Sequence, residues 1–162
     1  MALEHEYPLS PLELFATVTD LDYLVARHAR FGGVGDPEVT TQDGQVVVSI
    51  TRQLPTDKIP GPVRSMVGDG IIVQIDTWNQ PGETADLVTA TWRADVGNAP
   101  AQLGGAHTIE AVAAGAKYLI SVDVTIRVPL VGRQLASQVA GYLNQLIAKE
   151  QEYLAEWIAE NR

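Results

Sequence analysis

The chain has 162 residues, 46% hydrophobic and 19% charged, a balance typical of one globular domain, here residues 1–162, rather than of a disordered segment. Twenty Asp and Glu residues outnumber eleven Lys and Arg residues, and the resulting formal charge of −9 disfavours nucleic acid and anionic membrane surfaces as partners. Cysteine is absent, which excludes disulfides and thiolate chemistry.

The N-terminal part of the chain predicts one strand followed by two short helices. Residues 2–7 alternate Leu, His and Tyr with glutamates, which is the period-two pattern of a strand. Ser10 and Glu13 form the reciprocal capping box of a helix over residues 11–18, which begins with a proline. Asp20 is placed to cap a second helix, which ends at a pair of glycines.

From residue 38 to residue 127 the chain consists of β-branched runs separated by turn residues, which predicts an antiparallel meander. Asp43 and Gly44 suit a tight hairpin, because both residue types accept positive φ. We expect three hairpins, which add six strands to the N-terminal one and make seven. Their predicted residues are 37–42, 45–54, 70–78, 85–96, 102–112 and 117–128.

Residues 55–69 form an unusually long connection, since most connections within a domain have about 4–6 residues. The segment holds three prolines but also the apolar residues Ile59, Val63, Met66 and Val67. Two interpretations are open: a loop packed on the edge of the core, or a lid over a ligand cavity.

A long amphipathic helix is predicted from residue 131 onward. Its apolar stripe consists of Val131, Leu135, Val139, Tyr142, Leu143, Leu146, Ile147, Leu154, Trp157 and Ile158. The other side, interpreted as a solvated face, carries Lys149, Glu150, Glu152, Glu156 and Glu160. Thirty residues of helix span roughly 45 Å. Such a helix can cover the apolar face of a curled sheet and leave a space beneath its middle.

This order of elements resembles the helix-grip arrangement of the START-like superfamily, which includes lipid-transfer domains, plant pathogenesis-related proteins and aromatic polyketide cyclases. The stretch "PLSPLELFATVTDLDYL" is similar to the opening of these domains, and "VPLVGRQLA" resembles a bacterial family within the superfamily whose function is unknown. The resemblance implies an α+β fold. We therefore expect a seven-stranded curved antiparallel sheet, with two short helices and a long C-terminal helix packed across it.

Strand parity indicates which side chains face the expected space. His107 is the one ionisable residue that parity places inside, with Gly and Ala neighbours that leave room, whereas Asp76 and Arg93 are placed in solvent. His107 has two interpretations, a core histidine bonded to backbone or water, or a group that orients a ligand or exchanges protons with it. Trp92 and Tyr142 similarly suit either core packing or ligand contact. The candidate ligand contacts are Ile50, Met66, Val73, Trp92, His107, Ile109, Ile120 and Tyr142.

Motifs for other chemistry are missing from the sequence. The three histidines show no metal-ligand spacing with one another or with carboxylates, so we expect no metal and no cofactor. The glycine-rich stretch "FGGVGD" leaves a helix instead of leading into one, which is the wrong order for a phosphate-binding loop. There is no Gly-x-Ser-x-Gly nucleophile elbow, and we assign no catalytic residue.

The resulting hypothesis is a protein that binds or carries a small hydrophobic or amphipathic molecule, such as a lipid, an isoprenoid or a polyketide-like compound. One alternative is an enzyme of the cyclase, aromatase or hydrolase kind that uses the same cavity. Another is a protein-interaction module whose cavity is filled. With no signal peptide and no apolar run long enough for a membrane span, we expect a cytoplasmic protein without membrane insertion. The sequence leaves open whether the chain forms a homodimer.

Overall fold

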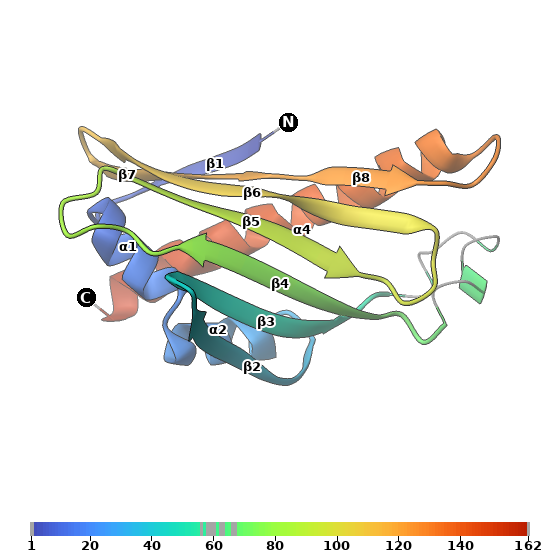
Figure 1. The fold of residues 1–162 in the computed structure, drawn as a ribbon, viewed down its shortest axis with the longest axis horizontal. Helices are drawn as coiled ribbons and strands as arrows, with labels where there is room; N and C mark the ends of the chain where they lie inside the picture. Colours follow the sequence, from blue (N-terminus) through green and yellow to red (C-terminus); the bar gives the residue numbers. More distant parts are fainter. Residues whose placement is uncertain (1, 56, 58–60, 62–63, 66–67, 162) are drawn as a thin grey trace.

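The computed structural model of this chain describes residues 2–55, 57, 61, 64–65 and 68–161. In this part of the chain the helices are α1 (Pro11–Val18), α2 (Leu21–Arg30) and α4 (Gly132–Asn161) (Figure 1). The strands are β1 (Ala2–Tyr7), β2 (Gly33–Gln42), β3 (Gln45–Gln53), β4 (Ile71–Asn79), β5 (Leu87–Asp95), β6 (Ala101–Val112), β7 (Gly115–Ser121) and β8 (Asp123–Ile126).

The two short helices begin where the capping residues predict. The Glu13 amide donates to Ser10 Oγ at 3.2 Å, and the Ser10 amide donates to Glu13 Oε1 at 3.1 Å, so both halves of the capping box are present. At the start of α2 the Tyr23 amide donates to Asp20 Oδ2 at 3.2 Å. Each cap satisfies backbone donors that the first turn of a helix leaves free, typically worth about 1 kcal/mol.

All strands belong to one antiparallel sheet with the order β1-β7-β6-β5-β4-β3-β2, and β8 pairs with β6 beyond the end of β7. We expected one strand over residues 117–128, and it is instead divided at Val122. Side chains replace ladder bonds at the break: the Ala106 amide donates to Ser121 Oγ, and Trp92 Nε1 donates to the Ser121 carbonyl oxygen. The predicted curved sheet of the helix-grip fold is confirmed.

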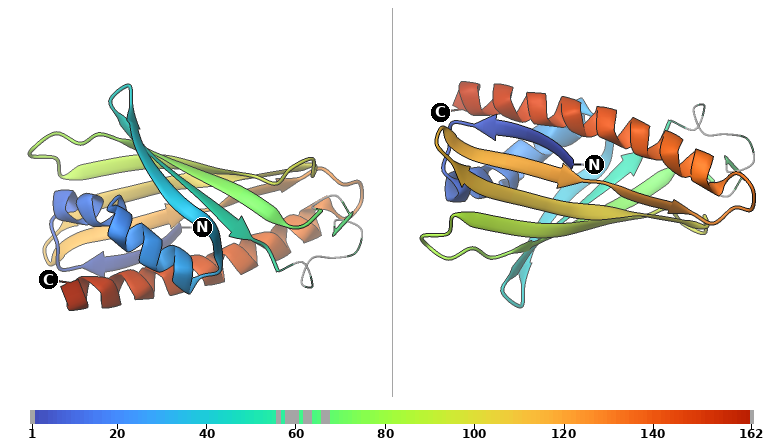
Figure 2. Two further views of the ribbon diagram at one scale, coloured as in Figure 1. Left: turned by 90° about the horizontal axis from the view of Figure 1, so that it is seen from below. Right: turned by 90° about the horizontal axis from the view of Figure 1, so that it is seen from above.

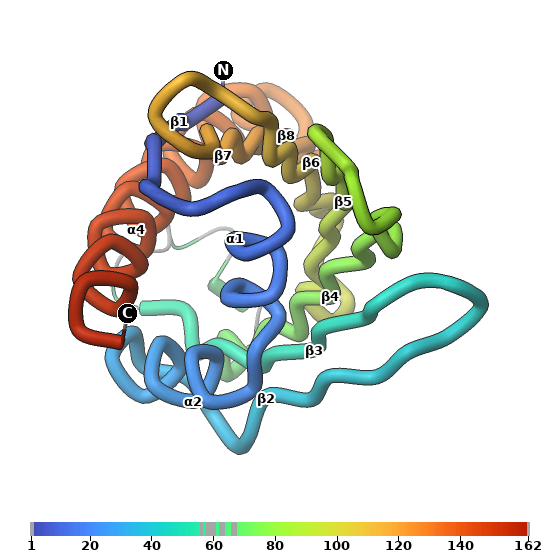
Figure 3. Tube along the Cα trace, turned by 90° about the vertical axis from the view of Figure 1, so that its left-hand side faces the viewer, coloured from blue at the N-terminus to red at the C-terminus, as the bar shows by residue number. Residues whose placement is uncertain are grey.

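The sheet and α4 together enclose the interior of the molecule. Seen end-on, the sheet curves from β2 round to β1, α4 lies along the remaining side, and α1 lies across one end (Figure 3). The two views of Figure 2 show α4 running along the length of the sheet. This helix packs against β8, β1 and α2, so it closes the interior along its whole length.

Two separate apolar clusters fill the interior. The large cluster combines α1, α2, the sheet and the end of α4, and its most buried members include Tyr7, Leu14, Tyr23, Leu24, Trp78, Ile109 and Leu154. The small cluster consists of Ile72, Trp92, Ala94, Val96, Leu103 and Leu135, with half-buried side chains such as Val139 and Leu143 packed against it. The interior is therefore not one continuous apolar core.

The prediction of which β4 side chains face the interior is wrong: the alternation is shifted by one residue. Ile72 and Asp76 are buried, with 3% and 5% exposed, whereas Val73 is 37% exposed on the other face. The sequence of β4 begins with three consecutive apolar residues, so alternation alone does not say which face is inside. Pairing with β3 decides it: Asp76 lies opposite Val48, and directly opposed residues share a face.

Candidate functional site

A cavity lies between the concave face of the sheet and α4, bounded by members of both apolar clusters. Its volume is about 70 Å³, which is room for roughly two water molecules at the liquid volume of about 30 Å³ each. Pockets for drug-sized ligands usually measure about 300–1,000 Å³. In this conformation the cavity therefore accommodates a small molecule or one end of a larger one.

Four of the predicted contact residues line this cavity, namely Trp92, His107, Ile120 and Tyr142. They come from three strands and from α4, so the fold does bring together residues that are far apart in the sequence. Tyr142 is half-buried, and the three strand residues are buried. Whether any of them contacts a ligand stays a prediction.

The other four predicted residues do not line the described cavity. Ile50 and Ile109 are buried in the large cluster, with 3% and 0% exposed, and so serve as core packing. Val73 lies on the outer face of the sheet, which corrects its predicted inward position. Met66 lies outside the described residues, as does most of the apolar content of residues 55–69, so the lid stays a hypothesis.

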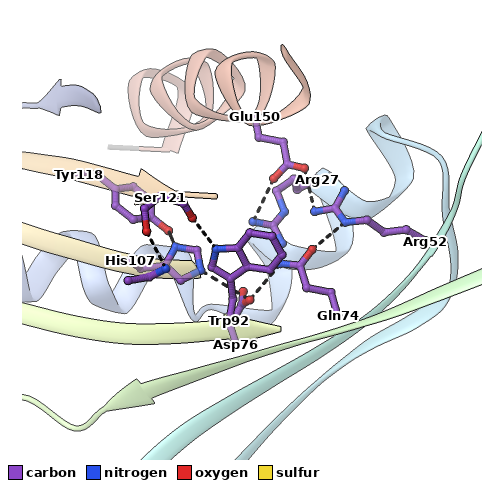
Figure 4. Close-up of polar contacts among 10 residues, drawn as sticks. Arg27, Arg52, Gln74, Asp76, Trp92, His107, Tyr118, Ser121 and Glu150 are labelled. Carbon is purple, nitrogen blue, oxygen red and sulfur yellow. Dashed lines mark hydrogen bonds and ion pairs between the residues drawn. The ribbon is translucent and has the colours of Figure 1, made fainter. Parts of the chain in front are cut away.

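His107 is a buried polar residue of the cavity and contacts three side chains. Tyr118 Oη and His107 Nδ1 are 2.8 Å apart, and the ring of Trp78 stacks on the imidazole with centroids 5.0 Å apart. His107 Nε2 lies 3.5 Å from Asp76 Oδ1 (Figure 4). Among the described residues, this buried nitrogen has no partner at hydrogen-bond geometry.

The surroundings of His107 shift the pKa values of its two polar partners, Asp76 and Tyr118. Burial raises the pKa of Asp76, but the opposing effects of His107, a hydrogen bond from Gln74, and Arg27 together lower it below the ordinary value of 3.8. Burial, and then Asp76, raise the pKa of Tyr118 well above 10.0, so the phenol stays protonated. With its phenol protonated, Tyr118 can donate to His107 Nδ1 in the tautomer that carries the ring hydrogen on Nε2.

A second polar group connects α4 to the sheet. Arg52 Nη2 lies 2.8 Å from Glu150 Oε1, and Arg52 Nε donates to Gln74 Oε1 at 3.1 Å. Gln74 Nε2 in turn donates to Asp76 Oδ1 at 2.9 Å (Figure 4). A continuous polar chain therefore runs from Glu150 on α4, through β3 and β4, to the carboxylate beside His107.

The helix pattern predicted that Glu150 lies on the solvated face of α4, and this prediction is wrong. The residue is 9% exposed and forms ion pairs with Arg52 and, at 3.6 Å, with Arg27 Nη1. It follows Ile147 by three positions and precedes Leu154 by four, which places it on the apolar stripe itself. This spacing is the signal that could have found it.

Gly105 provides less free space than its size suggests. A Cβ atom at this position would lie 2.7 Å from Trp92 Nε1 and would overlap the Ser121 carbonyl oxygen. The indole of Trp92 crosses Gly105 and donates to that oxygen at 2.9 Å. The prediction that small residues in β6 leave room for a ligand is therefore wrong at Gly105, whose space Trp92 occupies.

Two further findings concern what the site can hold. Within the described residues, no cluster of three or more His, Cys, Asp or Glu side chains is arranged to bind a metal ion. No helix in the described part of the chain combines the length and apolar content needed to cross a bilayer. The cavity offers instead two arginines, two carboxylates and one histidine beside apolar walls.

This architecture defines the class of the protein by its fold, a helix-grip domain. The structure of TTHA0849 from Thermus thermophilus superposes on this chain with a TM-score of 0.60 at 11% identity. The match covers 100% of this chain and 99% of that protein. The Zhui aromatase/cyclase from a Streptomyces species superposes with a TM-score of 0.58 at 9% identity, over 96% of this chain and 92% of its own. Identities this low show a shared fold alone.

The sequence pattern of DUF2505, described as a protein family of unknown function, matches residues 2–158, and the chain belongs to this family. The uncharacterized protein Rv0481c of Mycobacterium tuberculosis is 26% identical over 147 residues, covering 88% of this chain and 80% of that protein. The predicted resemblance to a family of unknown function is confirmed, and the solved structures confirm the helix-grip fold.

Proposed function

We propose that this protein binds a small amphipathic molecule in the cavity between its sheet and α4. The observation that carries the proposal is His107 Nε2 at the cavity, a buried atom whose contact with Asp76 Oδ1 is long, at 3.5 Å, and does not have hydrogen-bond geometry among the described residues. Buried polar atoms are nearly always hydrogen-bonded, because desolvation without compensation is costly. A ligand with a polar group next to an apolar part would satisfy His107 and fill the space beside Leu103 and Ile120.

Within the part of α4 that lines the cavity, residues 142–147 are packed less tightly than Leu154. Tyr142, Leu143, Leu146 and Ile147 line the cavity from α4 and are only half-buried, whereas Leu154 near the C-terminal end is 1% exposed. Local opening needs less free energy where fewer apolar contacts are lost. This part of α4 is therefore the expected route for entry, and its movement would be required for a lipid, isoprenoid or polyketide-like ligand that exceeds the present volume.

A cavity-filling variant tests the proposal directly. Ala94 is buried and lines the cavity, and Thr91 on the same strand faces the other side of the sheet. We expect A94F to reduce binding of any compound found by native mass spectrometry of the purified protein by at least about tenfold, since the added ring occupies the ligand's space. The matched variant T91F should bind as the wild type does, and equal binding by both variants would refute a ligand in this cavity.

The chain from Asp76 through His107 to Tyr118 favours a second candidate function, an enzyme that exchanges a proton with its ligand at His107. If a substrate is identified, H107Q should lower turnover by about 10²–10⁴. Y118F, which removes the partner of Nδ1, should shift the pH profile of the rate. An unchanged rate in H107Q excludes this function. The interaction-module alternative, which predicted a filled cavity, stays a prediction, because about 70 Å³ is well below the roughly 300–1,000 Å³ usual for ligand pockets.

A further inference from the structure

The two arginines that line the cavity differ in how firmly the protein binds them. Arg52 makes a close ion pair with Glu150 at 2.8 Å and a hydrogen bond to Gln74 at 3.1 Å. Arg27 approaches the same carboxylate only to 3.6 Å, and its guanidinium lies 5.7 Å from the centroid of the Tyr23 ring. Charge-assisted hydrogen bonds between guanidinium and carboxylate groups are usually about 2.7–2.9 Å long. Arg52 is thus a structural residue, and Arg27 has binding capacity left.

Arg27 keeps its charge despite its burial. The side chain is 13% exposed. Burial by itself lowers the pKa of its guanidinium, but Glu150, Tyr23 and Asp76 more than compensate and raise the pKa above its ordinary range. A cation that is already desolvated, and that has donors facing a cavity, favours an anionic partner.

The charge balance of the site limits what that partner can be. The two arginines are matched by two carboxylates, those of Asp76 and Glu150, and all four side chains line the same cavity. A group with two negative charges would meet repulsion from both carboxylates at short range. A monoanion that places one planar oxygen pair against the guanidinium fork encounters the least repulsion, and a carboxylate has that geometry.

We propose, resting on the ligand-binding function above, that the ligand is a monocarboxylate with an apolar tail and that Arg27 binds its carboxylate. The tail then lies along the apolar wall formed by Ile72, Leu103 and Leu143. Arg52 and Glu150 remain paired and form the polar side of the site. Arg27 is the residue that distinguishes an acid from a neutral molecule of the same shape.

Matched pairs of probes separate charge recognition from cavity binding. Butyrate, hexanoate and octanoate are titrated at neutral pH against butanol, hexanol and octanol, and dissociation constants are measured by calorimetry and by tryptophan fluorescence. We expect each acid to bind about ten- to a hundredfold more tightly than its alcohol, the range for a hydrogen bond to a charged group. R27Q should remove this preference while leaving alcohol binding within about twofold of the wild type.

Two control variants assign the effect to one residue. R93Q removes an arginine whose side chain is 65% exposed and should leave the preference unchanged. R27K retains the charge but not the planar fork, and we expect an intermediate preference. Thermal unfolding of each variant checks the fold, and R27K provides the test if R27Q does not fold.

Each outcome decides between the two proposals. Alcohols that bind as tightly as acids would support the cavity but overturn carboxylate recognition. A preference that persists in R27Q would overturn the role of Arg27. Absence of binding by every probe would overturn the carboxylate proposal and count against the proposed function as well. If native mass spectrometry then identifies a different bound compound, the proposed function alone stands.

Discussion

The two apolar clusters on the concave face differ in composition and in how they are covered. The large cluster is rich in aromatic residues and closed by three helices, and Leu14, Trp78 and Leu154 within it are at most 2% exposed. The small cluster contains smaller side chains such as Ala94, and α4 covers it with buried Leu135 and with half-buried residues such as Val139 and Leu143. Between them, β4 carries Gln74 and Asp76. The comparison indicates that the large cluster contributes most to stability, and that the site lies at the polar layer where the two clusters meet.

Truncation of matched leucines on α4 is the strongest test of this comparison. L154A removes a fully buried side chain from the large cluster and should lower the free energy of unfolding by about 2–5 kcal/mol. L143A removes a half-buried side chain beside the small cluster and should cost roughly 1 kcal/mol. Urea denaturation measures both. Equal losses would mean that the two ends contribute alike to stability.

Acid titration tests whether the polar layer is charged in the folded protein. The pKa of Asp76 is lower in the folded state than its ordinary 3.8, so its stabilising contribution is complete above that value and is lost as pH falls through the folded value. We expect D76N to be less stable than the wild type at neutral pH and the difference to shrink as pH falls below about 4. A difference independent of pH, measured by urea denaturation at several pH values, would contradict a buried charged Asp76.

The smallest expected effect concerns the part of α4 above the cavity. Gly141 is exposed, and a Cβ atom there would have no neighbour within 4 Å. G141A should therefore raise the free energy of unfolding by about 0.5–1 kcal/mol, because alanine loses less backbone entropy in a helix. If a ligand enters by local opening of α4, the same variant should slow ligand exchange. Loss of stability would show that this segment has contacts other than those described.

Local signals in the sequence were sufficient for the elements. The capping box of Ser10 and Glu13 and the Asp20 cap lie within a few residues of the helix starts that they define, and the alternation of β5 correctly placed Trp92 inside. Such signals depend on near neighbours in the chain. For the same reason His107 could be assigned to the interior from strand parity.

The charged residues of the site were missed for a common physical reason. Arg27, Arg52, Asp76 and Glu150 are each of a type that is usually solvated, and each becomes tolerable inside only because a group from another element meets it. The apolar run in β4 left the face of Asp76 undecided until pairing with β3 fixed it. Helical spacing from Ile147 and Leu154 offered the one usable signal, for Glu150.

Hydrophobic periodicity, turn residues and caps in the chain were enough to define a curved antiparallel sheet covered by a terminal helix, because these patterns act over short distances along the backbone. Packing in three dimensions decided which charges lie inside, how large the cavity is, and that Arg27 is bound less firmly than Arg52. Those properties depend on the opposing charges and side-chain volumes that α2, α4 and five strands bring to one place.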